Sequence, residues 1–107
     1  MKIKKNVLDR SLTFENFLQE QLQDNEFQKE YLRFNITEYS KNGDYAYFFK
    51  SLEQVVKSRT SVSKFAESIN LNRSNLSNIL KGKVQPSFDT TMKILRGLGA
   101  EFEIKIA

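Results

Sequence analysis

The polar side chains between residues 73 and 81 are of types that could contact DNA. Outside its apolar positions, this stretch carries only polar side chains, most of them short, and no acid. Arginine can form paired hydrogen bonds to guanine and asparagine to adenine, while serine hydroxyls can bond to either base. We therefore expect base-edge contacts from Arg73, Ser74, Asn75, Ser77 and Asn78.

A solvated helix face without a ligand is the alternative interpretation. An ordinary exposed helix mixes acids with bases, because oppositely charged side chains one turn apart stabilise it. The stretch from Arg73 to Lys81 contains bases and no acids. The composition therefore favours a face that binds a polyanion.

Two short helices and a tight turn are needed to hold these side chains in place. Ser61 suits the N-cap of the first helix, and Asn70 is one of the few non-glycine residue types that adopt a left-handed conformation at a helix end. Asn72 offers a second N-cap. The apolar positions at helical spacing are Val62, Phe65, Ala66 and Ile69 in the first helix and Leu76, Ile79 and Leu80 in the second.

Enzyme chemistry has little support in the composition. With no histidine and no cysteine, the chain lacks a base that titrates near neutral pH, a thiol nucleophile and the usual zinc ligands. It also lacks a glycine-rich phosphate loop. Glu101 and Glu103 are better interpreted as a solvated strand edge than as a catalytic pair. We expect no enzyme activity, no cofactor, no metal and no small-molecule substrate.

Charge is distributed unevenly along the chain, whose net charge is +4. Residues 57–98 contain eight bases and two acids, whereas residues 9–54 contain nine acids and five bases. A polyanion would be attracted to the first segment and repelled by the second. The distribution therefore predicts one basic half that faces nucleic acid.

A chain of 107 residues falls in the size range of one domain with short appendages. The basic N-terminus lacks the apolar segment of a secretory signal, and no run is apolar enough for a membrane helix. We expect a soluble cytoplasmic protein. Its expected divisions are an arm and accessory helices in 1–43, a DNA-binding bundle in 44–99 and a dimerisation strand in 100–107.

Helices are expected on both sides of the central motif. Thr13 could cap a first helix that carries Phe14, Phe17, Leu18 and Leu22 on one side. Further helices are expected over residues 26–41, stopped by Gly43, over 45–59 after an Asp44 cap, and over 88–98 after a Ser87 cap. Met1 to Arg10 is interpreted as an arm or a short edge strand.

Aromatic residues in the first half raise the question of a second partner. The run from Tyr45 to Phe49 is too aromatic to be fully solvated, and it suits either the core of a helical bundle or a partner surface. Phe14, Phe17 and Phe27 must also be buried somewhere. A second protein is one candidate for the surface that buries them.

The last eight residues change from a helical period to strict alternation. Phe102, Ile104 and Ile106 share one face, which is the pattern of a half-buried strand. Such a strand needs a partner for its backbone. The candidates are the same strand of a second copy, residues 1–5 of the same chain, or another protein. We favour the second copy, because a dimer with two recognition helices matches a two-fold DNA site.

The motif from Phe65 to Gly82 resembles the helix-turn-helix of the Xre/Cro-like, lambda-repressor-like DNA-binding family. The resemblance continues through Lys83 and the apolar helix that ends at Leu98. Asn70 stands where that family commonly has glycine. The resemblance implies an all-α helical bundle.

The order of motifs over about residues 14–106 is similar to the probable addiction-module antidote family, the HigA-like antitoxins. Residues 24–32 (DNEFQKEYL), 43–44 (GD) and 88–99 (FDTTMKILRGLG) correspond to its strings "D-P-E-F-x-x-E-Y-L", "G-D" and "F-D-T-x-x-K-(I/V)-L-(R/K)-x-L-G". The string at 24–32 departs in having Asn25 for the common proline, which affects only a helix start.

This second resemblance implies an antitoxin that acts as a homodimer. It would bind operator DNA, repress its own operon and hold inactive a RelE-like or HigB-like ribonuclease toxin. The alternatives are a stand-alone Xre-family regulator of phage or mobile-element origin and an interaction-only adaptor. The family's base-reading positions fall on Arg73, Ser74, Ser77 and Asn78. Its phosphate contacts fall on Ser61 or Ser63, with Lys64 beside them, and on Lys81 and Lys83.

Overall fold

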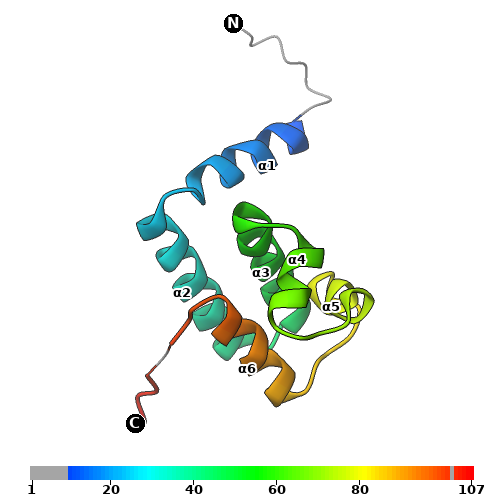
Figure 1. Ribbon diagram of the computed structural model, residues 1–107. Coiled ribbons are helices and arrows are strands. Elements are labelled where there is room, and N and C mark those ends of the chain that lie inside the picture. The colour runs from blue at the N-terminus through cyan, green and yellow to red at the C-terminus, as the bar shows by residue number, and fades with distance from the viewer. Residues whose placement is uncertain (1–9, 102) are drawn as a thin grey trace, which may run out of the picture.

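The computed structural model describes residues 10–101 and 103–107, and within these residues the fold is all-α (Figure 1). This confirms the all-α part of the predicted fold class. The six helices are α1 (Arg10–Gln21), α2 (Asn25–Asn42), α3 (Tyr45–Arg59), α4 (Val62–Ser68), α5 (Arg73–Leu80) and α6 (Phe88–Gly97). No helix among the described residues is long and apolar enough to cross a membrane.

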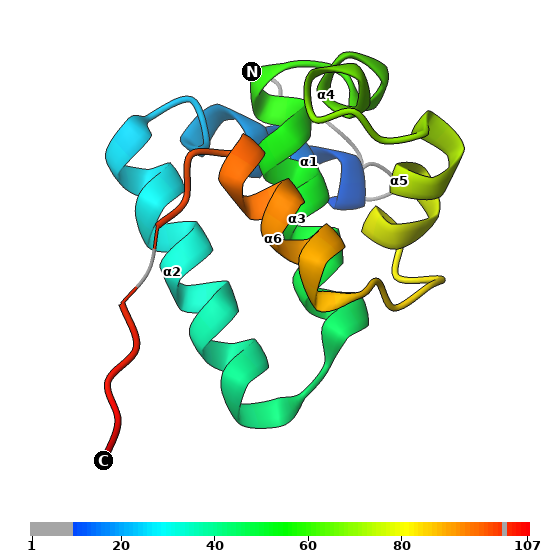
Figure 2. The same cartoon turned by 60° about the horizontal axis from the view of Figure 1, so that its bottom comes forward.

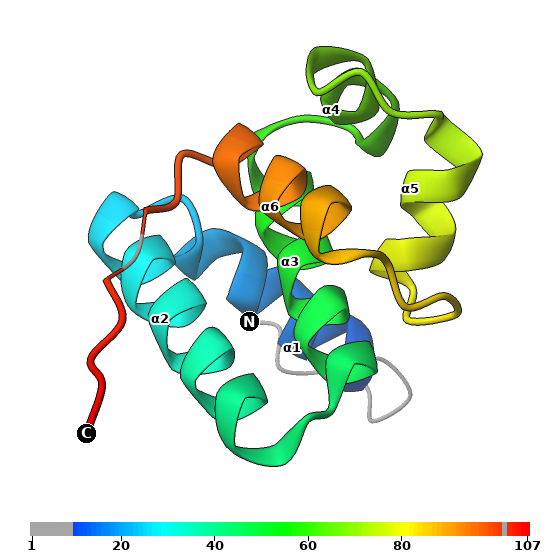
Figure 3. The same ribbon diagram turned by 90° about the horizontal axis from the view of Figure 1, so that it is seen from below.

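The helix α3 is the centre around which the others pack. Its buried residues lie on several sides of the helix: Phe48, Phe49, Ser51, Leu52, Glu53, Val55 and Val56. It packs against α2, α4 and α5, and α6 lies across it in the views of Figures 2 and 3. In all three views α2 and α5 lie on opposite sides of the molecule.

The predicted helix starts are confirmed at four caps. In each case a side-chain oxygen accepts a hydrogen bond from a backbone N–H in the first helical turn, which satisfies a group that has no partner within the helix. These caps are Asp44 for α3, Ser61 for α4, Asn72 for α5 and Ser87 for α6. Gly43, with φ of 70°, ends α2 as predicted.

Thr13 does not cap the first helix. Helix α1 begins at Arg10, four residues before the Phe14 start that a Thr13 cap predicts, so Thr13 lies inside it. No glycine or proline stands between Arg10 and Thr13 to stop the helix. Asp24 caps the next helix by accepting from the backbone N–H of Glu26 at 3.0 Å.

The aromatic run at the start of α3 divides between the core and the surface. Phe48 and Phe49 are buried, and the ring of Phe48 stacks on that of Tyr39 with centroids 5.0 Å apart. Tyr47 is 59% exposed. The core interpretation is confirmed for Phe48 and Phe49, and Tyr47 stays outside the core because adjacent helical residues face different directions.

The predicted C-terminal strand is absent. Residues 100–101 and 103–107 carry no strand, and Ile104 and Ile106 are 81% and 89% exposed. The described chain offers these residues no neighbouring strand with which to pair. The pairing predicted for Phe102 and for residues 1–5 lies outside the described residues, as does the arm predicted over residues 1–9.

Candidate nucleic-acid interface

The turn between α4 and α5 sets the direction of α5. Asn70 has φ of 61°, the left-handed conformation predicted for it. The N–H of the following residue, Leu71, donates to the carbonyl oxygen of Ala66 at 2.9 Å. Asn72 then caps α5 by accepting from the N–H of Asn75 at 3.0 Å. Two consecutive local interactions therefore hold the start of α5.

One side of α5 is buried and the other carries the predicted base-reading residues. Leu76, Ile79 and Leu80 are buried, which anchors the helix to the core. Arg73, Ser74, Asn75 and Asn78 are exposed, and Ser77 is half-buried. Four of the five predicted side chains are thus accessible, and the exposed positions from 73 to 81 include no acid.

The residues predicted to contact phosphates lie at both ends of this helix pair. Ser61, Ser63 and Lys64 are exposed in the first turn of α4, and Lys83 is exposed in the loop after α5. The Ser61 hydroxyl oxygen accepts from the backbone N–H of Lys64 at 3.1 Å. Because this bond uses the oxygen as acceptor, the hydroxyl hydrogen can still donate to an anion.

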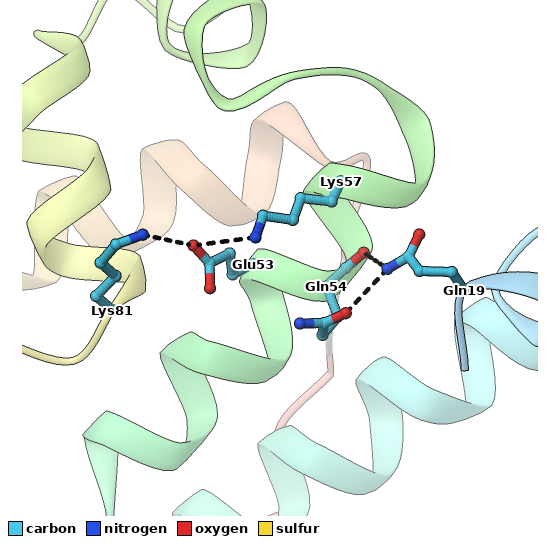
Figure 4. Close-up of polar contacts among 5 residues, drawn as sticks. All are labelled: Gln19, Glu53, Gln54, Lys57 and Lys81. Carbon is cyan, nitrogen blue, oxygen red and sulfur yellow. Dashed lines mark hydrogen bonds and ion pairs between the residues drawn. The ribbon is translucent and has the colours of Figure 1, made fainter. Parts of the chain in front are cut away.

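Lys81 differs from the other predicted phosphate ligands because it has a protein partner. Its Nζ lies 3.4 Å from Oε2 of Glu53 on α3, and the Nζ of Lys57 lies 3.8 Å from the same oxygen. Figure 4 shows the two ammonium groups reaching this oxygen from either side. The Glu53 side chain is 12% exposed, whereas the two lysines are about half exposed.

Sequence reasoning missed Glu53 and did not assign Lys57 to the site. The spacing of four residues between them on one helix is a visible signal for an ion pair. The contact with Lys81 joins residues 28 positions apart, and no local pattern predicts it.

Arg59 belongs to the basic half and is exposed, but its guanidinium is bonded to groups of the fold. Its Nε donates to Oε1 of Gln28 at 2.7 Å, and its Nη1 donates to the carbonyl oxygen of Leu98 at 2.8 Å. Partial burial lowers the pKa of its guanidinium from the ordinary value. Arg59, one of the eight bases in residues 57–98, therefore holds helices together through hydrogen bonds within the fold.

Exposed aromatic side chains gather on the helices that precede α4. Phe14 and Phe17 on α1 are 64% and 55% exposed, Phe34 on α2 is 61% exposed, and Tyr47 on α3 is also exposed. Leu18 of α1 packs against the core, and Leu22, directly after α1, is part of the core. The α1 helix thus has more apolar surface than the described chain covers.

The comparison with known families shows which family the chain belongs to. The sequence model of one family, described as "Probable addiction module antidote protein", matches residues 13–106. The chain belongs to this family. The match covers all six helices except the first residues of α1. Membership of the antidote family gives the protein the role of an antitoxin in an addiction module, a role that implies a toxin partner.

Two other comparisons gave no match. Neither a curated protein nor a solved structure matched the chain.

Proposed function

We propose that this antitoxin binds operator DNA through α4 and α5, represses its own operon as a homodimer and neutralises a RelE-like or HigB-like ribonuclease toxin. The observation that carries the DNA-binding part is the exposed face of α5. Arg73, Asn75 and Asn78 offer the donor and acceptor groups that read guanine and adenine, and no acid stands among them.

The arrangement of α4 and α5 suits a helix-turn-helix. In such motifs the second helix lies in the major groove with its N-terminal residues at base edges, while the first helix crosses the backbone. Here Arg73 is the first residue of α5, and the Asn72 cap and the Asn70 turn hold that end in place. The exposed Ser63 and Lys64 in the first turn of α4 would then lie near the phosphates.

The proposal that the protein acts as a dimer rests on the geometry of DNA sites. One α5 helix reads only a few base pairs, and two copies related by a two-fold axis would read a palindromic site. We do not propose dimer formation by the C-terminal residues, because those described there, 100–101 and 103–107, form no strand.

The aromatic side chains exposed on α1 are the surface we propose for the toxin. An antidote must cover a toxin, and Phe14 and Phe17 present apolar area that the described chain leaves open. In Figure 1, α1 lies at the top of the molecule and α5 lies at its lower right. Separate surfaces would let one molecule hold DNA and toxin together.

Co-expression tests the antitoxin part of the proposal. The protein encoded by the adjacent reading frame is produced with and without this chain, and both cell growth and co-purification are followed. We expect growth arrest by the neighbour alone, relief by this chain and a stable complex. A neighbour that is harmless and does not co-purify would favour a stand-alone regulator instead.

A further inference from the structure

The carboxylate of Glu53 lies where the basic half of the molecule would meet DNA, which is an unexpected place for an acid. It sits on α3, behind the end of α5, and its side chain is 12% exposed. A carboxylate this far from water needs a counter-charge, because burying an unpaired ion is strongly unfavourable. Lys57 and Lys81 both supply one (Figure 4).

The two lysines contact Glu53 from different elements. Lys57 is one turn further along α3, so its position relative to Glu53 is set by the helix. Lys81 follows the last residue of α5 and reaches Glu53 from another helix. Both side chains remain about half exposed. Only Lys81 is at a position predicted to contact phosphate.

A phosphate and Glu53 would compete for the ammonium group of Lys81. If Lys81 turned toward DNA with no other base nearby, it would leave the Glu53 carboxylate largely buried and unpaired. Lys57 removes this cost, because its ammonium group stays beside the same oxygen. The effect of Lys57 on DNA binding would thus act through Glu53, without a contact between Lys57 and DNA.

We propose that Lys57 is a positioning residue that neutralises Glu53 and so frees Lys81 to bind a DNA backbone phosphate. This inference rests on the proposed function, because it assumes that DNA binds at the end of α5. It adds a residue that the phosphate-contact prediction did not contain.

A double-mutant cycle tests the inference. Binding of a fluorescent duplex is titrated at two salt concentrations for the wild type, Lys57→Met, Glu53→Gln and the double variant. We expect Lys57→Met to weaken binding by about fivefold, the upper range for one partly exposed ion pair. In the Glu53→Gln background, where no buried charge needs a partner, we expect Lys57→Met to have no effect.

Two further variants complete the test. Lys41→Met, which removes a base from the end of α2, controls for the loss of one positive charge and should change affinity little. In a Lys81→Met background, Lys57→Met should again have no effect, which keeps the test valid if Glu53→Gln fails to fold. Thermal unfolding of every variant verifies the fold.

The salt dependence separates the outcomes. Lys57→Met should lower the slope of log affinity against log salt by about one in the wild-type background and leave it unchanged in the other two. An equal loss of affinity in all three backgrounds, or no loss in any, would overturn the inference alone. Absence of salt-dependent binding by the wild type would overturn the proposed function as well.

Discussion

The guanidinium group of Arg59 donates a hydrogen bond to the backbone carbonyl oxygen of Leu98 at 2.8 Å. This bond joins the last residue of α3 to the residue that caps α6. The same guanidinium donates to Gln28 of α2, whose amide in turn donates to the carbonyl oxygen of Leu22 at 2.7 Å. One arginine thereby fixes the ends of helices that are far apart in the sequence.

Replacement of Arg59 should destabilise the fold. Arg59→Met would leave the Leu98 carbonyl and the Gln28 side chain without a donor, and an unsatisfied buried group costs about 1–3 kcal/mol. Urea unfolding measures the loss. Arg33→Met is the matched control, because Arg33 forms an exposed ion pair with Glu30 and should lose less than about 1 kcal/mol. Equal losses for the two variants would refute the role of Arg59.

Gly82 should tolerate a methyl group far less well than Gly43. Both have positive φ, 76° and 70°, so alanine at either position should cost about 1 kcal/mol of backbone strain. A Cβ atom at Gly82 would also lie 2.8 Å from Cβ of Ala46, whereas at Gly43 it would meet nothing within 4 Å. Gly82→Ala should therefore lower the free energy of unfolding by about 1–3 kcal/mol more than Gly43→Ala does. Thermal unfolding of both variants measures the difference, and equal melting temperatures would contradict the close packing of α5 on α3.

Tyr31 should make the fold sensitive to alkaline pH. Burial, and secondarily the nearby Tyr47, raises the pKa of Tyr31 to about 12 from its ordinary 10.0. The neutral ring is thus favoured in the folded state, and its contribution is complete below pH 10 and is lost as the pH rises toward 12. The free energy of unfolding of the wild type should fall more steeply over this interval than that of Tyr31→Phe. Urea unfolding at pH values on both sides of 10 provides the comparison. If the free energies of unfolding of the two proteins fall in parallel with pH, Tyr31 is not the source of the alkaline sensitivity.

The exposed phenylalanines of α1 should matter to the toxin and not to DNA. Phe14→Ser with Phe17→Ser should abolish co-purification with the toxin, because a buried aromatic side chain at an interface contributes about 2 kcal/mol or more. DNA affinity should be unchanged. Phe88→Ser is the control, since Phe88 is 77% exposed on α6 and lies outside the proposed surface. Retention of the toxin by the double variant would place its binding site elsewhere.

Local signals in the sequence predicted the helices α4 and α5 and the turn between them. Helix caps such as Asn72 and Ser87 depend on hydrogen bonds within three residues, and the left-handed turn at Asn70 depends on one residue type. The buried positions of α4 and α5 followed from a 3.6-residue period. These features were predictable because the chain within a few residues determines them.

Features that depend on a distant partner were not predictable in the same way. The alternation of Ile104 and Ile106 suggested a strand, but alternation alone supplies no neighbour for the backbone. The contact between Glu53 and Lys81 and the internal use of Arg59 both depend on which helices pack together. For Thr13, a good capping residue was not enough, because no glycine or proline in residues 10–12 stops the helix.

The most direct test of the account is the selectivity of DNA binding by Arg73→Ala. Wild type and variant are titrated at two salt concentrations against duplex from the upstream region of the gene and against single-base-pair changes in it. Arg96→Ala, an exposed arginine on α6, serves as the control for charge.

Loss of a paired contact to guanine should cost the Arg73→Ala variant about 1–3 kcal/mol and remove discrimination at one base pair. Arg96→Ala should keep that discrimination. This result would establish α5 as the reading helix. Wild-type binding that is independent of salt and sequence, or an Arg73→Ala variant that selects bases as the wild type does, would contradict the account.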